Sequence, residues 1–301
     1  LIYQGVESAG HSLGLRTMQI TPATRKEGEA YLESVFKQMT VQGDTIRRLL
    51  IVASSGYDTW LRKNNKRLES TSNADLLYFE TDTPLDGKGS TLRMPYYGAM
   101  YEAGALTPHF MPKAFVIGAN PEDQPIQDAI QGFKDGFATE FIAQRKEKKL
   151  ITEYIGQHTG EGYSISDTLA LKMMQDYETK YDHIETVIVP ICGGAGSVFE
   201  RLSMLLYRFI VMGVDIELTS ANSQFSIVKR IDRVVDQSIR QWYAGEAIPK
   251  HQSLGLASGY TGLTLHIRPY PLLFLYPEEV SDDVLQQIHE EAIRKEEEYE
   301  K

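Results

Sequence analysis

Short apolar runs alternate with longer amphipathic stretches along the 301 residues of the chain. The runs have the length and the Val, Ile, Leu and Phe content that predict strands. They lie at Leu15–Ile20, Leu49–Ala53, Leu76–Phe79, Ala114–Gly118, Ile151–Ile155, Thr186–Ile191, Val211–Ile216, Phe225–Val228 and Leu263–Ile267. Helical periodicity falls between them, at Glu27–Met39, Asp58–Glu69, Pro95–Leu106, Ile126–Phe137, Ser166–Tyr177, Ser197–Phe209 and Ile231–Tyr243. This alternation predicts an α/β fold with parallel sheets.

Several of the strand-like runs, Leu49–Val52 among them, are apolar at every position, which favours strands with helices on both faces. Nine strands fit two sheets better than one, so two lobes are expected. A boundary is predicted near His109–Lys113, where two prolines bracket a short connector. The segment Thr81–Arg93, with Pro84, Gly87 and Gly89, is predicted to be an exposed loop.

The net charge of −10 excludes a uniformly basic nucleic-acid-binding surface. Ten acidic and three basic residues lie in Glu278–Lys301, so most of that charge belongs to the tail. Val284, Ile288 and Ala292 recur there at a spacing of four, which predicts an acidic helix with one buried stripe. No run reaches the ~18 apolar residues that a membrane helix needs.

Metal and disulfide chemistry have little support in the sequence. The one cysteine, Cys192, excludes an internal disulfide and a multi-cysteine metal site, and we expect it to be a small buried hydrophobe. The seven histidines show no H-x-x-x-H spacing. We therefore expect no metal and no cofactor.

Gly10-His11-Ser12-Leu13-Gly14 matches the G-x-S-x-G pattern of serine hydrolases. That pattern works at a strand-to-helix turn. Here a helical pattern precedes the motif and an apolar run follows it, so Gly14 is predicted to end a helix. A serine esterase that uses Ser12 is kept as the less favoured alternative.

Two turns follow strands and open helices, at the sheet edge where open α/β folds bind ligands. The first is Ser54-Ser55-Gly56-Tyr57-Asp58, in which Asp58 has a helix-capping alternative and Tyr57 a core alternative. The second is Gly193-Gly194-Ala195-Gly196-Ser197. It matches neither G-x-G-x-x-G nor a P-loop, so an uncharged ligand is favoured over a nucleotide.

A collinear set of motifs carries a family resemblance. The motifs are Val187–Gly196, Met212–Asp215, Phe225–Asp232, Tyr96–Gly104, Asp128–Gly136 and Gly255–Thr261. Together they resemble the basic membrane protein family of type I periplasmic solute-binding proteins, to which purine-nucleoside receptor lipoproteins belong. The second acid of the family's G-V-D-S-D-Q pattern is replaced here, where the sequence runs from Gly213 to Leu218 as G-V-D-I-E-L.

The resemblance implies two doubly wound lobes joined by a hinge, with the family's first strand missing from this chain. Lobe one is expected over 1–112 plus 230–252, and lobe two over 113–229 plus 253–301. It also implies a protein outside the cytoplasm, a signal segment that has been removed, and a lipid anchor, if one exists, outside this chain. The expected function is capture of a small solute in an interlobe cleft for an ABC importer or a sensor, without catalysis.

Site roles follow from the same resemblance and from side-chain chemistry. Asp215 and Asp58 are expected to accept hydrogen bonds from ligand hydroxyls. Tyr57 and Phe199 are expected to stack on a ring, and Lys229 either contacts the ligand or pairs with Asp215. The remaining candidates that contact the ligand are Ser54, Ser55, Gly56, Gly193 and Gly194. The expected ligand is neutral and ring-containing, with a nucleoside ahead of a sugar.

Overall fold

In a computed structural model, the chain forms two compact units. The first unit comprises Leu1–Met94 and Arg230–Leu254, and the second comprises Pro95–Lys229 and Gly255–Lys301. The structure describes residues 1–41, 49–53, 57–69, 74–79, 81, 84–85, 89–139, 141, 147–181, 186–206, 209–215, 217–218, 223, 225–265 and 280–301. The side chains of 38–41, 58 and 68–69 are outside this description.

The first unit contains a parallel four-stranded sheet of order β1-β2-β3-β10. Its strands are β1 (Leu49–Ala53), β2 (Ala74–Phe79), β3 (Ser90–Arg93) and β10 (His251–Ser253). The sequence predicted the first two strands and missed the last two. β3 lies inside the segment predicted to be a loop, and β10 has only three residues with no apolar pattern. Pairing with neighbouring strands, rather than local sequence, makes these two segments extended.

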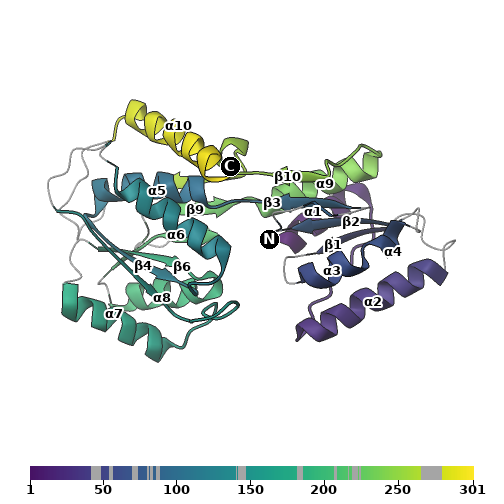
Figure 1. Cartoon of the computed structure of the whole chain (residues 1–301), viewed down its shortest axis with the longest axis horizontal. Coiled ribbons are helices and arrows are strands. Elements are labelled where there is room, and N and C mark those ends of the chain that lie inside the picture. The colour runs from purple at the N-terminus through teal and green to yellow at the C-terminus, as the bar shows by residue number, and fades with distance from the viewer. Residues whose placement is uncertain are drawn as a thin grey trace. The chain divides into compact units, whose positions relative to one another are not determined.

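Helices lie on both sides of this sheet, and Figure 1 shows α9 on one side with α2 and α3 on the other. The helices of the unit are α1 (Ile2–Leu13), α2 (Arg25–Val41), α3 (Asp58–Asn64), α4 (Lys66–Glu69) and α9 (Ile231–Ala244). On α9, Trp242 donates a hydrogen bond of 2.8 Å from Nε1 to Asp75 of β2. On the other side, Phe36 of α2 packs edge-on against Trp60 of α3, with ring centroids 5.2 Å apart.

The prediction of a strand over Leu15–Ile20 was wrong. Gly14 ends α1 in the left-handed conformation, with φ 67°, and donates its N–H to the Gly10 carbonyl. The residues that follow belong to no strand, and Met18 and Ile20 are 74% and 41% exposed. These side chains are apolar but are not buried in the structure. The helix-ending role of Gly14 is confirmed.

The second unit contains a parallel sheet of order β5-β4-β6-β7 and a smaller sheet of order β11-β9-β8. The strands are β4 (Lys113–Gly118), β5 (Lys149–Tyr154), β6 (Thr186–Ile191), β7 (Ile210–Val211), β8 (Gly213–Asp215), β9 (Phe225–Lys229) and β11 (Thr261–Leu265). The run expected as one strand over Val211–Ile216 is divided at Met212 between β7 and β8, and residue 216 is outside the described residues. β8 is parallel to β9, whereas β11 is antiparallel to it.

The described part of the second unit also contains helices, and Figure 1 shows α6, with α5 beside it, on one face of the larger sheet and α7 and α8 on the other. They are α5 (Tyr97–Phe110), α6 (Gln124–Phe137), α7 (Asp167–Tyr181), α8 (Gly196–Leu206) and α10 (Asp282–Tyr299). The α/β fold with parallel sheets is thus confirmed. Among the described helices, none combines the length and the apolar character needed to cross a membrane.

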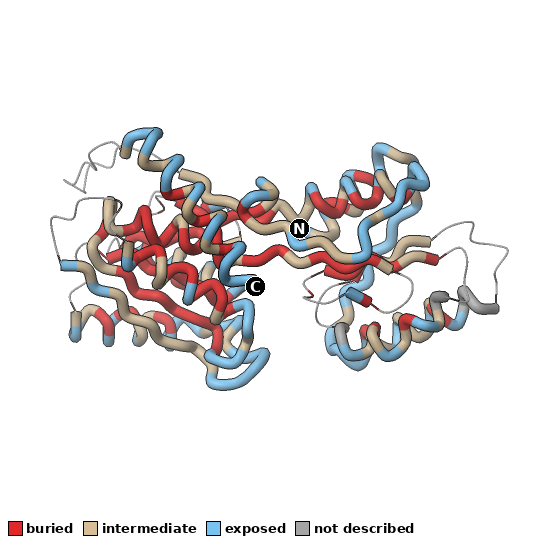
Figure 2. The backbone as a smooth tube through the Cα atoms, turned by 45° about the horizontal axis from the view of Figure 1, so that its top comes forward, coloured by how far each residue is buried: buried red, intermediate tan, exposed pale blue. Residues whose placement is uncertain are grey.

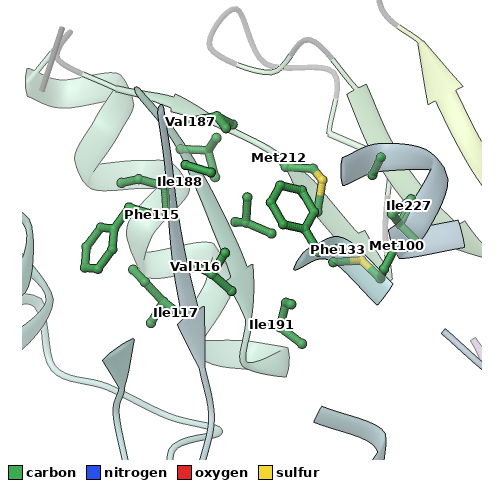
Figure 3. Close-up of a cluster of buried hydrophobic side chains, with 14 of the residues drawn as sticks. Met100, Phe115, Val116, Ile117, Phe133, Val187, Ile188, Ile191, Met212 and Ile227 are labelled. Carbon is green, nitrogen blue, oxygen red and sulfur yellow. The ribbon is translucent and has the colours of Figure 1, made fainter. Parts of the chain in front are cut away.

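The main core lies between these layers. Figure 3 shows strand residues such as Phe115 and Ile188 together with Met100 of α5 and Phe133 of α6. All four residues are fully buried. The central strands of this unit are buried along most of their length, whereas the outer helix positions are exposed (Figure 2). Burial on both faces explains the continuous apolar runs of the sequence.

α5 and α6 approach each other through three glycines. A Cβ on Gly104 of α5 would lie directly against the Phe133 carbonyl, and one on Gly136 of α6 directly against the Tyr101 carbonyl. Gly132 faces the Tyr97 carbonyl in the same way. This contact holds α5 in the second unit. The unit boundary therefore lies between Met94 and Pro95 instead of the expected position after residue 112.

The tail helix α10 packs on the second unit along the predicted stripe. Ile288 and Ala292 are 0% exposed, and Val284 packs against the cluster formed by Ile288 and Leu106. Ser281 precedes the helix and accepts a hydrogen bond from the Val284 N–H through Oγ. On the same helix, His289 Nδ1 lies 3.1 Å from a carboxylate oxygen of Glu102 on α5.

Replacing Gly136 with alanine should lower the free energy of unfolding by about 1–3 kcal/mol, because the added methyl group would push α6 away from the backbone of α5. Urea unfolding measures this change. Gly262→Ala is the matched control, since no atom of the described residues lies within 4 Å of a Cβ built there. Equal losses in both variants would contradict the close contact.

His289 should stabilise the fold only when it is protonated. Its hydrogen bond to Glu102 raises its pKa above the ordinary value. The stabilisation is therefore fully present below the unfolded pKa of about 6.5 and is lost as the pH rises through the folded value. The side chain is 45% exposed, so the gain should stay below about 1 kcal/mol.

Urea unfolding of the wild type and of His289→Gln at acidic and alkaline pH measures this effect. The stability difference between the two proteins should shrink with rising pH. A difference that grows with rising pH would contradict the assignment. Glu102→Gln should abolish the pH dependence of the difference.

Candidate functional site

Polar and aromatic side chains gather at the carboxyl ends of β6 and β8 in the second unit. We call Asp215, Tyr96, Lys229, Tyr163 and Gly193 the Asp215 cluster. They come from five separate segments of the chain. The cluster lies within one unit, at the strand edge where open α/β sheets bind ligands.

Asp215 is the last residue of β8 and adopts a left-handed backbone conformation, with φ 71°. It is the one non-glycine residue with positive φ in the part of the chain that the structure describes. Such a conformation is uncommon for a residue with a Cβ, although aspartate tolerates it better than most. Strained backbone of this kind concentrates at functional sites, which singles out Asp215.

Tyr96 contacts both Asp215 and Lys229. The Tyr96 hydroxyl donates a hydrogen bond to Asp215 Oδ1. Lys229 is 2% exposed, and its ammonium nitrogen lies 3.3 Å from the centroid of the Tyr96 ring. A buried cation is stabilised by the negative face of an aromatic ring. Among the described residues, Tyr96 is the hydrogen-bond partner of Asp215, which leaves Oδ2 as a further acceptor.

Tyr163 supplies the aromatic surface of the cluster. Its hydroxyl donates a hydrogen bond of 2.9 Å to Asp123, which also accepts from Asn120 and from the Gly160 N–H. These contacts join the loop after β4 to the loop after β5. Burial, the hydrogen bond to Asp123, and the charges of Asp123 and Asp215 raise the pKa of Tyr163 above its usual value. The hydroxyl is therefore a fixed donor, and the ring remains 40% exposed.

The glycine turn lies beside that ring. Gly193 and Gly194 are exposed residues of a 3₁₀ turn, Gly193–Ala195, between β6 and α8. A Cβ built on Gly193 would lie 3.1 Å from Cδ1 of Tyr163. Gly193 also has φ 53°, a conformation that favours glycine. Glycine here lets the Tyr163 ring rest close to the backbone.

Cys192 precedes the turn and is buried. Burial, with a smaller contribution from the charge of Asp215, raises the pKa of its thiol to about 12. The expectation that Cys192 is a buried hydrophobe is confirmed. Because the thiolate is the reactive form, this cysteine is no nucleophile near neutral pH.

The predicted ligand-contacting residues of the first unit lie outside the Asp215 cluster or outside the described residues. Ser54, Ser55 and Gly56 lie outside the described residues. Tyr57 packs against the first-unit core, and its hydroxyl end lies directly over Gly28 of α2, which is the core alternative. Asp58 is the first residue of α3, while Tyr57 occupies the capping position that was expected for Asp58.

Phe199 is the clear correction. It was expected to stack on a ligand ring, but it is 0% exposed inside the second-unit core. On α8, it belongs to the same buried cluster as the strand residues of the larger sheet. Tyr163 is the aromatic residue beside Gly193 instead. Sequence reasoning passed over Tyr163 because it lies in an irregular loop with no motif.

Ser12 lies in the last turn of α1, where its hydroxyl donates to the Ala9 carbonyl and accepts a 2.7 Å hydrogen bond from Arg240. Ser12 lies inside this helix and not in a turn between a strand and a helix, so the geometry of a nucleophile elbow is not formed. An arginine donor on the hydroxyl oxygen is also the opposite of the base that an attacking serine needs.

The comparisons with known proteins concern the fold. Over 98% of this chain and 86% of the other, the structure is similar to an ABC transporter system solute-binding protein from Aeropyrum pernix K1, with TM-score 0.72 and 16% identity. The structure is also similar to a transcriptional activator of the comK gene from Bacillus halodurans, with TM-score 0.68 and 15% identity over 97% of this chain and 91% of the other. A third similar structure is an ABC transporter periplasmic solute-binding protein from Actinobacillus succinogenes 130z with bound D-allose. Its TM-score is 0.60 and its identity 14%, over 84% of this chain and 89% of the other.

The chain therefore has the α/β fold of periplasmic solute-binding proteins. No family model and no curated protein sequence matches the chain. The narrower resemblance to the basic membrane protein family accordingly stays a prediction.

Cys192 should react with Ellman's reagent at pH 8 on the order of a thousandfold more slowly in the folded protein than in guanidinium. The reason is the loss of thiolate when the pKa rises to about 12. Absorbance of the released thiol follows the reaction, and Cys192→Ser gives the background. Full labelling of the folded protein within seconds would contradict the buried position.

Proposed function

We propose that this protein is a solute-binding protein of the cell envelope that captures a small, neutral, ring-containing solute and delivers it to an ABC importer or a sensor. The observation that carries the proposal is the Asp215 cluster. A fold alone does not define a function, and one of the structural neighbours is a transcriptional activator. The chemistry of the cluster is therefore the main support.

The cluster suits a hydroxylated ring. Asp215 Oδ2 is a charged acceptor, and a hydrogen bond from a ligand hydroxyl to a carboxylate is stronger than one to a neutral oxygen. The exposed Tyr163 ring offers a flat surface for the face of a sugar or a base. The backbone N–H groups of the exposed turn at Gly193 and Gly194 add neutral donors.

The charges in the cluster and beside it oppose an anionic solute. The carboxylates of Asp123 and Asp215 both act on Tyr163, by a hydrogen bond and by charge. The one cation of the cluster, Lys229, is buried with its ammonium over the Tyr96 ring. A phosphate placed there would meet two negative charges at short range. A neutral solute avoids this cost.

Two ligand types fit these requirements. The family resemblance favours a nucleoside, whereas the D-allose of one structural neighbour favours a sugar. Both present ring hydroxyls for Asp215 and a ring face for Tyr163. Calorimetric titration with D-allose, D-ribose, inosine and guanosine, and with the corresponding phosphates, separates them.

At least one neutral compound of this panel should bind more tightly than its phosphate. Tighter binding of a phosphate would contradict the charge argument. Absence of binding across the panel, together with an unchanged melting temperature, would contradict the proposed function, because a ligand that binds only the folded state must stabilise it.

Tyr163→Ala should weaken binding of the tightest panel compound by about tenfold or more, since aromatic stacking on a base contributes on the order of 1–3 kcal/mol. Tyr163→Phe keeps the ring and should stay close to wild type. Tyr243→Ala is the control, because Tyr243 is 50% exposed on α9 of the first unit. Equal affinity of Tyr163→Ala and the wild type would exclude the stacking role.

Asp215→Asn keeps the shape of the side chain and removes its charge. Affinity for the same compound should fall by about tenfold or more, because hydrogen bonds to charged groups are worth roughly 1.5–3 kcal/mol. The phosphorylated compounds should lose less affinity, or gain some, because a repelling carboxylate is gone. An unchanged ratio between neutral and phosphorylated compounds would contradict the role of this charge.

A further inference from the structure

Glu296 is a buried carboxylate that the proposed binding chemistry does not use. It lies near the end of α10 and is 5% exposed, although glutamate is almost never buried without partners. Its neighbours on the same helix, Glu297 and Glu298, are exposed. The difference within one acidic stretch indicates a specific role for Glu296.

Each oxygen of this carboxylate binds a different segment of the chain. Oε1 accepts a 2.9 Å hydrogen bond from the Gly98 N–H, and Oε2 accepts a 2.7 Å hydrogen bond from the Leu256 N–H. Gly98 lies in the first turn of α5, where the N–H groups have no partner within the helix. A negative charge there is stabilised by the helix dipole and by charge-assisted hydrogen bonds.

Two glycines make room for the carboxylate. A Cβ on Gly98 would lie 2.8 Å from Cδ of Glu296, and a Cβ on Gly255 would lie directly against Oε2. Both contacts are with the carboxyl group itself. The two segments are therefore shaped around Glu296.

Both segments begin where the chain enters the second unit, at Pro95 and Gly255. The first of them carries Tyr96, the residue that caps α5 and whose carbonyl accepts a 2.9 Å hydrogen bond from the Met100 N–H. Tyr96 in turn donates its hydroxyl to Asp215. A continuous path of hydrogen bonds and helix backbone thus leads from the tail helix to the Asp215 cluster.

We propose that Glu296 is a positioning residue for solute binding: it fixes the start of α5, and thereby the Tyr96 side chain that orients Asp215. The proposal rests on the proposed function for its effect on affinity. The competing role is a structural one, in which Glu296 only anchors α10. The two roles differ in what happens at Tyr96.

The first experiment needs no ligand. The ring signals of Tyr96 are observed by ¹H–¹³C NMR of the tyrosine-labelled 301-residue chain, and Tyr96→Phe assigns them. Glu296→Gln and Glu296→Ala should shift the Tyr96 signals, whereas the control Glu297→Ala should not. Tyr96 signals that stay unchanged while the melting temperature falls would overturn the proposal and leave the anchoring role.

The second experiment measures affinity for D-allose and inosine in a double-mutant cycle. Glu296→Gln should weaken binding about tenfold in the wild-type background and have little further effect in the Tyr96→Phe background, because both changes act through one path. Equal effects in both backgrounds would overturn the proposal. If the wild type binds neither probe, the proposed function fails for these ligands, and the NMR result alone decides the role of Glu296.

Glu296→Gln keeps the volume of the side chain and is the variant expected to fold. Gly255→Ala serves as a second route, because it displaces the carboxylate without removing it. It should shift the Tyr96 signals in the same direction as Glu296→Gln. An unshifted Tyr96 in Gly255→Ala, with the protein folded, would also count against the proposal.

Discussion

The second unit depends on the contact between the backbones of α5 and α6. Three glycines let the helices approach until each lies against carbonyl groups of the other. This contact fixes the position of α5 beside β9 and β11 of the smaller sheet, and α5 begins at the residue after Tyr96. The tail helix then binds the same helix start through Glu296. The Asp215 cluster thus includes Tyr96, whose position follows from the packing of the helix that it caps.

Electrostatics divide this region into two parts. Glu296 is a buried charge whose partners are backbone N–H groups, so its role is to hold the chain in place. Asp215 is a charge with one hydrogen-bond partner among the described residues, so it retains an acceptor for a solute. Lys229 lies buried, with its ammonium over the Tyr96 ring. We propose that this arrangement selects neutral, hydroxylated solutes.

The fold could be predicted from the sequence wherever the buried positions form a regular pattern of apolar residues. β6, apolar and buried along its whole length, was predicted with its observed bounds, and the stripe of Ile288 and Ala292 on α10 was recognised by its spacing. β3 and β10 left no such pattern, because short polar segments become strands only through pairing. Leu15–Ile20 has an apolar pattern, but its side chains are not buried, so a strand was predicted where none forms.

The site was harder to predict, because a motif shows which residues meet the backbone requirements of a turn but not which side chains face solvent. Phe199 follows the glycine turn and lies in the core, whereas Tyr163 comes from a loop with no motif and rests on Gly193. Tyr96 and Glu296 depend on contacts between segments distant in sequence, which no local pattern records.

The most direct measurement is a crystal structure of the chain with the neutral compound that binds most tightly. The account predicts a ligand hydroxyl within hydrogen-bond distance of Asp215 and a ligand ring face against Tyr163. A ligand bound away from both residues, with Asp215 still held by Tyr96 alone, would contradict the account.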